Sequence, residues 1–393
     1  MPLRYLTAGE SHGPRLTTII EGLPAGLEIH QGLIDEQLLR RRRGYGAGPR
    51  MKMERDKVRI VGGVLANMTT GAPVAIQIEN DDHRNWVGKE HAPLTIPRPG
   101  HADLTAAIKY GYRDLRFSLE RASARETAAR VAVGALCRHF LAQFAIVIGG
   151  YVRSIADISA PVQGVDLAER SRIAETNEVR SPDEDAAQLM IARIKKVIRD
   201  RNTLGGTIEV FATGLPPGLG SHVHWDRRLD SRLGAVVLGV QAIKGIEFGS
   251  AFENTKLPGT EIQDAIRLSG DDIVRPTNRA GGLEGGITNG NPLLIRAAMK
   301  PIATTLTPQP TVDLLKREQV PTQYERSDFC PVPRAVPIIE AVVAIELAKA
   351  LLEKLGGDTM EEMKTRFASL RQARLSDLVM DESPRQYWSE VEG

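Results

Sequence analysis

The stretch Arg4-Tyr-Leu-Thr-Ala-Gly-Glu-Ser-His-Gly-Pro-Arg-Leu-Thr-Thr-Ile-Ile-Glu21 decides the fold class. Two short runs typical of strands, Arg4–Thr7 and Leu16–Glu21, flank a turn with two glycines, and a third such run follows at Leu27–His30. Short strand-like runs separated by turns favour strands that pair with their neighbours in the sequence. The chain is therefore expected to begin with antiparallel strands.

The turn itself, Gly9-Glu-Ser-His-Gly13, matches the nucleophile-elbow pattern of α/β-hydrolases. An elbow needs a strand before it, a helix after it and an earlier loop that supplies an oxyanion donor. Only eight residues precede Gly9, and Thr17–Ile20 predicts a strand instead of a helix. The context argues against a hydrolase.

Beyond residue 30, helices and strands alternate without a regular βαβ rhythm. A helix is expected over Ile34–Arg43, and strands are expected near Val58–Val61 and Val74–Ile78. Residues 80–100 read as a long surface loop, a kind of segment that is usually functional or disordered. This interleaving predicts an α+β fold.

Three further helices are predicted from their end signals. Ser123-Ala-Arg-Glu126 reads as a capping box that opens a helix to about Gln143. Ser181-Pro-Asp-Glu184 reads as a second box, with Pro182 at the first helical position and basic residues in the last turn. The third helix is expected over Ile338–Leu355. Its acid Glu340 lies away from the charged face and is interpreted as a first-turn acid.

No fixed-period repeat, low-complexity tract or composition shift marks a boundary between domains. We therefore expect one unit over residues 1–393, with a peripheral C-terminal helix and tail from about residue 358.

The composition excludes several function classes. Fifty-one Lys and Arg against forty-nine Asp and Glu give a net charge of +2, so no overall field draws the chain to nucleic acid or membrane. The most apolar stretch, Ala335–Leu355, contains charged residues, which argues against a membrane helix, and no signal peptide is apparent. Two cysteines, Cys137 and Cys330, cannot form a disulfide framework. A cytoplasmic location is expected.

Two other motifs are weak. Gly44-x-Gly-x-Gly48 follows a helix and precedes Pro49, so it is a poor dinucleotide fingerprint and is interpreted as a flexible linker running to Arg50. His222 and His224 would lie on one side of a strand, but no clear third ligand accompanies them, and no metal site is predicted.

The basic run Arg40–Arg43 leaves three interpretations open. It could be a solvated helix end, an RNA-binding patch or a site for a small polyanion, since arginine presents a planar fork to phosphate and carboxylate. Aromatic residues make up only 5% of the chain and no stacking motif is present, which argues against RNA.

Several loops combine glycine, arginine and other polar residues, and two of them carry His12 and His101. Arginines bind anions, and histidine can transfer protons near neutral pH. These loops predict an enzyme that acts on a small phosphorylated or carboxylated compound.

Six motifs carry a resemblance to a known family. They are Gly9–Gly13, Arg98–Asp103, Glu120–Thr127, Gln241–Glu247, Arg275–Gly286 and Arg326–Asp328. On these motifs, in this order, the chain resembles the chorismate synthase family over residues 3 to 355. The resemblance implies a β-α-β sandwich of antiparallel sheets and helices, and a homotetramer. It also implies conversion of 5-enolpyruvylshikimate 3-phosphate to chorismate, by anti 1,4-elimination of phosphate and a ring hydrogen, with reduced FMN and no net redox change.

The resemblance assigns catalysis to His12, His101 and Asp328. His101 would supply a proton or a charge-assisted hydrogen bond to the departing phosphate. His12 would hold the protonation state of the reduced flavin, and Asp328 would act with the flavin to remove the ring hydrogen.

The binding residues follow from the same resemblance. Anion clamps for the substrate are expected at Arg41, Arg50 and Arg125, with Arg121 as a further candidate. The residues expected to bind FMN are Arg121, Ala122, Ser123, Gln241, Ala242, Gly285, Lys300, Pro301, Ile302, Ala303, Thr304 and Arg326. Structural alternatives stay open for Ser123 as a helix cap, Gln241 as a helix end and Thr304 as a strand residue.

The chain departs from the family pattern at Ala47, where many relatives carry an arginine linked to NADP binding or to the substrate clamp. The sequence also shows no separate flavin-reductase segment, so the enzyme is expected to receive reduced FMN from an external source.

Overall fold

The N-terminal strands form one antiparallel sheet, as predicted. The computed structural model describes residues 2–48, 56–325 and 327–388. The sheet has the order β1-β2-β6-β3, and its strands are β1 (Arg4–Ala8), β2 (Arg15–Glu21), β6 (Val74–Glu79) and β3 (Val58–Gly62). Buried and half-buried residues alternate along β6, so one face of the sheet is turned towards the core.

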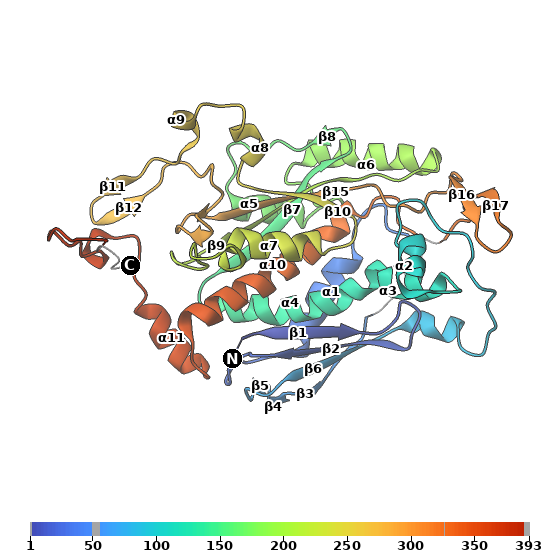
Figure 1. The fold of residues 1–393 in the computed structure, drawn as a ribbon, viewed down its shortest axis with the longest axis horizontal. Coiled ribbons are helices and arrows are strands. Elements are labelled where there is room, and N and C mark those ends of the chain that lie inside the picture. Colours follow the sequence, from blue (N-terminus) through green and yellow to red (C-terminus); the bar gives the residue numbers. More distant parts are fainter. Residues whose placement is uncertain (1, 49–55, 326, 389–393) are drawn as a thin grey trace, which may run out of the picture.

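A second antiparallel sheet lies on the other side of the molecule (Figure 1). Its order is β10-β15-β9-β7-β8, and its strands are β10 (Ile243–Phe248), β15 (Leu293–Met299), β9 (Gly206–Thr213), β7 (Val147–Ile155) and β8 (Ile158–Ser159). All of its pairings are antiparallel.

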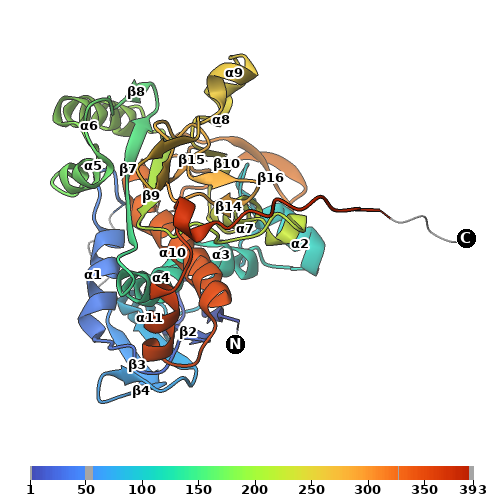
Figure 2. The same cartoon turned by 90° about the vertical axis from the view of Figure 1, so that its left-hand side faces the viewer.

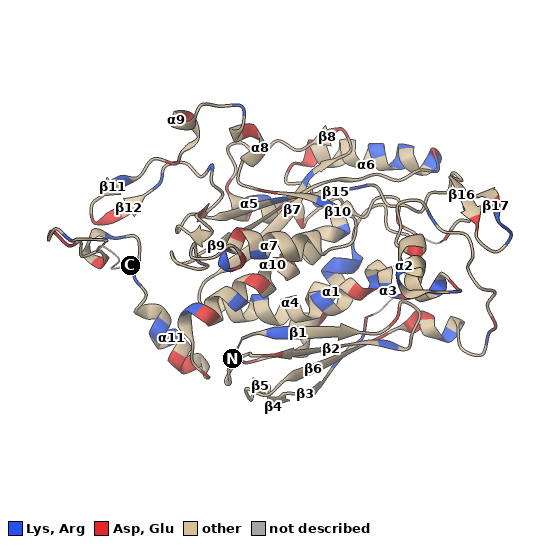
Figure 3. Ribbon diagram, viewed as in Figure 1, with Lys and Arg blue, Asp and Glu red and all other residues tan. Residues whose placement is uncertain are grey.

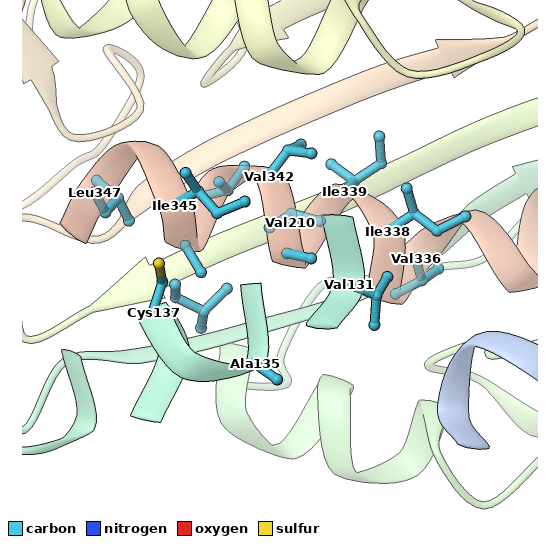
Figure 4. Close-up of a cluster of buried hydrophobic side chains, with 14 of the residues drawn as sticks. Val131, Ala135, Cys137, Val210, Val336, Ile338, Ile339, Val342, Ile345 and Leu347 are labelled. Atoms are coloured by element: carbon cyan, nitrogen blue, oxygen red, sulfur yellow. The ribbon is translucent and has the colours of Figure 1, made fainter. Parts of the chain in front are cut away.

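Three helices fill the space between the two sheets (Figures 1 and 2). They are α1 (Gln31–Arg42), α4 (Thr127–Ala142) and α10 (Val332–Leu355). α10 packs on α4 and on strands β7 and β9, while α4 and α1 contact the N-terminal sheet. Figure 4 shows Val131 and Cys137 of α4 facing the apolar side chains of α10, with Val210 of β9 behind them. The buried helix layer therefore joins both sheets into one hydrophobic core.

Shorter elements surround these layers. They are β4 (Val64–Leu65), β5 (Met68–Thr69), η2 (Asp81–Asn85), α2 (Asp103–Tyr110), α3 (Arg116–Ala122), η3 (Ala124–Glu126), α5 (Leu167–Ala174), α6 (Glu184–Arg199), η4 (Trp225–Arg227), α7 (Leu229–Leu238), α8 (Ala251–Asn254), α9 (Gly259–Ile262), β11 (Arg267–Ser269), β12 (Asp272–Val274), β13 (Leu283–Glu284), β14 (Ile287–Thr288), β16 (Pro310–Asp313), β17 (Glu318–Pro321), α11 (Met360–Ala368) and η5 (Leu375–Asp377). Over the described ranges, no helix is both long and apolar enough to cross a bilayer.

The α+β class is confirmed, but the prediction of a strand at Leu27–His30 is wrong. Within that run only Glu28 makes an isolated bridge, to Met68. Nearby, Leu27 donates its backbone N–H to the Thr69 hydroxyl instead of joining a ladder. A loop buries the apolar side chains here. A run of strand-forming residues alone does not show whether the segment is a buried loop or a strand.

The start of the third predicted helix is also wrong, because α10 begins at Val332 and not near residue 338. Pro337 lies inside the helix and has no N–H to donate to the carbonyl of Pro333. The guanidinium of Arg180 satisfies that carbonyl at 2.7 Å. A distant arginine thus lets the helix continue through a proline.

Both predicted capping boxes are absent. Ser123 caps the short η3 by accepting from the N–H of Arg125, and the side chain of Glu126 bonds to Thr7 and Arg130. The cap of α6 is Asp183, which accepts from the N–H of Ala186, so α6 begins beyond Pro182. The predicted charge order along α6 is confirmed, with acids in the first turn and bases in the last (Figure 3).

The interpretation of Arg40–Arg43 as a solvated end is right only for the exposed Arg43, and that of Glu340 as a first-turn acid is wrong. Arg40 donates to both Glu340 and Glu175, and Arg138 reaches Glu340 from α4. Glu340 is only 1% exposed. Burial alone would raise the pKa of Glu340, but Arg40 and Arg138 outweigh it and lower the pKa. The RNA-binding alternative loses most of its basic surface, because Arg40 pairs with Glu340 and the buried Arg41 pairs with Asp56.

The glycine run Gly44–Gly48 is not a linker over its described part. Its carbonyl at Gly46 accepts the N–H of Phe329 at 2.9 Å, and the N–H of Gly48 donates to Asp328 at 2.7 Å. The rest of the predicted linker lies outside the described residues.

Candidate active site

One cavity of about 500 Å³ lies where several of the arginine- and glycine-containing loops meet. His12, His101 and Asp328 all line it, although they come from the β1–β2 turn, the segment before α2 and the segment before α10. Cavities of this size are typical of sites for small molecules.

His12 is held from two sides. Its ring Nδ1 lies 2.6 Å from a carboxylate oxygen of Glu120, and its backbone N–H donates to the other oxygen at 2.8 Å. The indole of Trp86 packs against the ring with centroids 4.1 Å apart and the planes tilted by 36°. Burial alone would raise the pKa of Glu120, but its contacts with His12 outweigh burial and lower it. The imidazole is therefore fixed in one orientation by an ionised carboxylate.

His101 has a similar partner. Its Nδ1 lies 2.6 Å from Asp103, which is nearly buried at the start of α2. Arg98 donates to the same carboxylate at 2.8 Å and places a second guanidinium nitrogen 3.0 Å from the ring. Burial alone would raise the pKa of Asp103, but the hydrogen bonds from His101 and Arg98 outweigh it and lower the pKa. Asp103 thus holds both the imidazole of His101 and the guanidinium of Arg98 in place.

Asp328 faces the cavity with both carboxylate oxygens bonded. One accepts the N–H of Gly48 and the other accepts from the guanidinium of Arg334.

The predicted substrate clamps Arg41 and Arg125 also line the cavity, but both are almost fully buried. Arg125 forms an ion pair with Asp56, and Arg41 lies 3.6 Å from the same carboxylate. Burial alone would raise the pKa of Asp56, but these guanidinium groups outweigh it and lower the pKa. Arg50, the third predicted clamp, lies outside the described residues.

Most of the residues predicted to bind the cofactor meet in this cavity. Those on its walls are Ala122, Ser123, Gln241, Ala242, Lys300, Ile302, Ala303 and Thr304. Pro301 is not among the lining residues, and Gly285 belongs to the β13–β14 hairpin away from the cavity wall. Arg121 lines a neighbouring hollow of about 460 Å³, which Gln241 also borders. Arg326 lies outside the described residues.

Two features of the Gln241–Ala242 segment fit a bound polar ligand. The side-chain oxygen of Gln241 is buried and has no hydrogen-bond partner among the described residues. Ala242 has a φ of 66°, in the left-handed region that a residue with a Cβ rarely adopts. Strain of this kind clusters at ligand sites, where the surrounding structure holds it. Here the carbonyl of Ala242 accepts the N–H of Lys300 at 2.9 Å.

The sequence analysis missed the residues that hold the histidines and the aspartate. These are Trp86, Arg98, Asp103, Glu120 and Arg334. A signal existed for Asp103, which lies two residues from His101 in the same motif. No local signal marked Glu120 as the partner of His12, because 108 residues separate them.

The fold and the cavity define an enzyme site for a small anionic molecule, with two carboxylate-bound imidazoles and a doubly bonded aspartate on its walls. A family model described as chorismate synthase matches residues 3–352. The chain belongs to the chorismate synthase family.

Individual relatives agree with this assignment. A chorismate synthase of Syntrophotalea carbinolica is 51% identical over 372 residues, covering 92% of this chain and 96% of the relative. One of Symbiobacterium thermophilum is 50% identical over 381 residues, covering 93% and 97%. A chorismate synthase crystal structure superposes with a TM-score of 0.78 at 42% identity, covering 94% of this chain and 97% of the other.

Proposed function

We propose that this protein is a chorismate synthase, which converts 5-enolpyruvylshikimate 3-phosphate to chorismate and phosphate by anti 1,4-elimination. Family membership over nearly the whole chain supports this. So does the layered arrangement of two antiparallel sheets around buried helices, which is the fold that the family resemblance implies. The observation that carries the proposal is the meeting of His12, His101 and Asp328 in one cavity.

The substrate carries one phosphate and two carboxylates, so the cavity must neutralise several negative charges. Lys300 and Arg98 line it as cations, and the buried Arg41 and Arg125 add positive charge to the wall. Because Arg41 and Arg125 are buried, water screens their charge less and their attraction for an anion is stronger. We assign binding of the anionic groups of the substrate to Arg41, Arg98 and Arg125 together with Arg50.

The elimination breaks an allylic C–O bond and leaves negative charge on the departing phosphate. His101 supplies a proton or a charge-assisted hydrogen bond to that oxygen. Asp103 holds the imidazole by Nδ1, so the transfer falls to Nε2. The carboxylate of Asp328 receives the ring hydrogen as a proton, and His12 maintains protonation at the cofactor.

Reduced FMN is the proposed cofactor, and the residues present fit it. Gln241 offers a buried acceptor, Lys300 and Thr304 suit a phosphate, and the segment of Ala122 and Ser123 approaches the cavity from the end of α3. When bound, reduced FMN would transiently lend electron density to the allylic system. Gly285, Pro301, Arg121 and Arg326 remain proposed contacts.

The proposal extends to the setting of the enzyme. It is a homotetramer in the cytoplasm that obtains reduced FMN from an external source. Ala47 does not bind NADP through its side chain, because an alanine side chain cannot pair with an anion.

The experiment that tests the proposal is an anaerobic assay of the purified protein with 5-enolpyruvylshikimate 3-phosphate. Samples with reduced FMN, with oxidised FMN and without flavin are compared for chorismate and phosphate release. Formation of chorismate only with reduced FMN is expected. Turnover without flavin would instead indicate a redox-independent phosphatase or transferase, and a lack of product in every sample would refute the proposal.

A further inference from the structure

The run Gly44-x-Gly-x-Gly48 packs closely against the segment that leads into α10, and this close packing explains why the run is rich in glycine. A Cβ added at Gly44 would lie 2.9 Å from Arg334, one at Gly46 would lie 3.0 Å from Cys330, and one at Gly48 would lie 2.6 Å from the carbonyl oxygen of Ser327. All three glycines therefore pack against residues 327–334, and a side chain at any of them would force its neighbour to shift.

Two hydrogen bonds hold the two segments side by side. The N–H of Phe329 donates to the carbonyl of Gly46 at 2.9 Å, and the N–H of Gly48 donates to Oδ1 of Asp328 at 2.7 Å. The carboxylate of Asp328 is thereby bonded to backbone that only a glycine permits to come so near.

The other carboxylate oxygen is bonded to Arg334, in the first turns of α10. The same guanidinium donates through Nε to the carbonyl of Arg41 at 3.2 Å, near the C-terminal end of α1. Arg334 is only 8% exposed and lines the cavity beside Asp328. It thus connects the aspartate to the buried helix layer.

We propose that Gly48 and Arg334 are positioning residues that hold the Asp328 carboxylate in its reactive orientation. The inference rests on the proposed function, in which Asp328 receives the ring proton. A carboxylate bonded at both oxygens has one orientation, and losing either bond frees it to rotate. Displacements of about 1 Å at a reacting group can lower the rate by about 100-fold.

The chain offers a matched control in Arg180. Its guanidinium also bonds to the C-terminal end of α1, donating to the carbonyl of Arg40 at 2.7 Å and to that of Arg43 at 2.9 Å. Arg180 also donates to the carbonyl of Pro333 at 2.7 Å, so it supports the same first turns of α10 as Arg334 does. Unlike Arg334, Arg180 does not line the cavity. Substituting either arginine removes bonds to the helix end, but only one substitution removes a bond to Asp328.

The test compares Arg334→Gln, Arg334→Lys and Arg180→Gln in the full-length protein loaded with reduced FMN. We expect Arg334→Gln to lower kcat by about 10- to 100-fold with KM changed by less than about 3-fold. Arg334→Lys should recover part of the loss, because it restores a cation without the fork. Arg180→Gln should lower the thermal midpoint but keep kcat within about 2-fold below that temperature. Equal kcat values for Arg334→Gln and Arg180→Gln would overturn the proposal.

A double-variant cycle with Asp328→Asn isolates the coupling between the two residues. If Arg334 acts through Asp328, adding Arg334→Gln to Asp328→Asn costs little further activity. Independent, multiplying losses would contradict the inference.

Gly48→Ala gives a second route if Arg334 variants fold poorly, with Gly234→Ala as its control because no neighbour lies within 4 Å of a Cβ there. Crystal structures of Arg334→Gln and Gly48→Ala add a readout that does not depend on turnover. A rotated Asp328 carboxylate is expected in both, and an unmoved one would contradict the proposal. Wild-type protein that makes no chorismate would refute the proposed function, whereas the crystal structures would still decide the positioning.

Discussion

Glu120 binds His12 at two points, through the ring Nδ1 at 2.6 Å and through the backbone N–H at 2.8 Å. The two residues are 108 positions apart in the sequence, and their contact holds the start of the chain against α3. A carboxylate bonded to Nδ1 fixes the tautomer of an imidazole, so it determines which nitrogen exchanges protons with a ligand.

Replacing Glu120 with glutamine keeps the shape but removes the charge. We expect Glu120→Gln to lower kcat by about 10-fold or more, because the amide no longer enforces one tautomer or stabilises a charged ring. Steady-state kinetics across pH 6 to 9 measure the effect. The control is Glu28→Gln, which alters an exposed pair with His30 at 2.9 Å and should leave kcat unchanged. Identical kinetics in both variants would contradict a role for Glu120.

The buried carboxylate of Glu340 predicts a large effect on stability. Glu340→Gln should lower the free energy of unfolding by about 3–5 kcal/mol, because it removes the buried carboxylate that Arg40 and Arg138 share. Among the described residues, Arg40 then keeps only Glu175 as an ionic partner. Urea unfolding measures this. Glu353→Gln, on the same helix but more than half exposed in its pair with Arg232, should cost less than about 1 kcal/mol. Equal losses would mean that burial does not govern these pairs.

Acid should destabilise the folded protein through carboxylates whose pKa is lowered by buried arginines. Asp56, bonded to Arg125 and near Arg41, is one of them. The unfolded chain takes up a proton at its ordinary pKa of about 3.9, and the folded chain only at lower pH. Its contribution is therefore complete above about pH 5 and is lost as pH falls towards the folded pKa. Urea midpoints from pH 6 to pH 3 should fall less steeply in Asp56→Asn than in wild type, and parallel curves would contradict the assignment.

The close approach of α4 and α10 depends on Gly134. A Cβ at this position would lie 2.4 Å from the Cβ of Ala341, so the helices would have to separate. Gly134→Ala should therefore destabilise the protein by about 1–3 kcal/mol, although alanine favours a helix by about 1 kcal/mol over glycine. Gly234→Ala in α7, where a Cβ meets no neighbour, should be neutral or stabilising. Thermal unfolding of both variants measures the difference, and a stabilised Gly134→Ala would refute close packing.

Local patterns predicted much of the fold. The strands around Gly9–Gly13 and the charge order of α6 follow from spacing within a few residues, and both were predicted correctly. The pairing of Arg40 with Glu340 spans 300 residues and was not predictable from either neighbourhood. For the same reason, the largely buried arginines at the end of α1 were expected to be solvated.

The candidate site likewise contains residues that were predictable from local sequence and residues that were not. Its motif histidines and Asp328 were named from the sequence, and the structure brings them to one cavity. The glycine run was misinterpreted, because its close contacts are with residues 327–334 and nothing in the run itself identifies them. Residues that carry a motif can be named in advance, whereas those that position them depend on tertiary contacts.

An anaerobic single-turnover experiment tests the central claim most directly. Enzyme with reduced FMN is mixed with 5-enolpyruvylshikimate 3-phosphate, and phosphate, diene absorbance and flavin absorbance are followed together. The account predicts one chorismate for each phosphate, with the flavin reduced again at the end. Phosphate release without the diene, or one equivalent of flavin oxidised for each turnover, would contradict it.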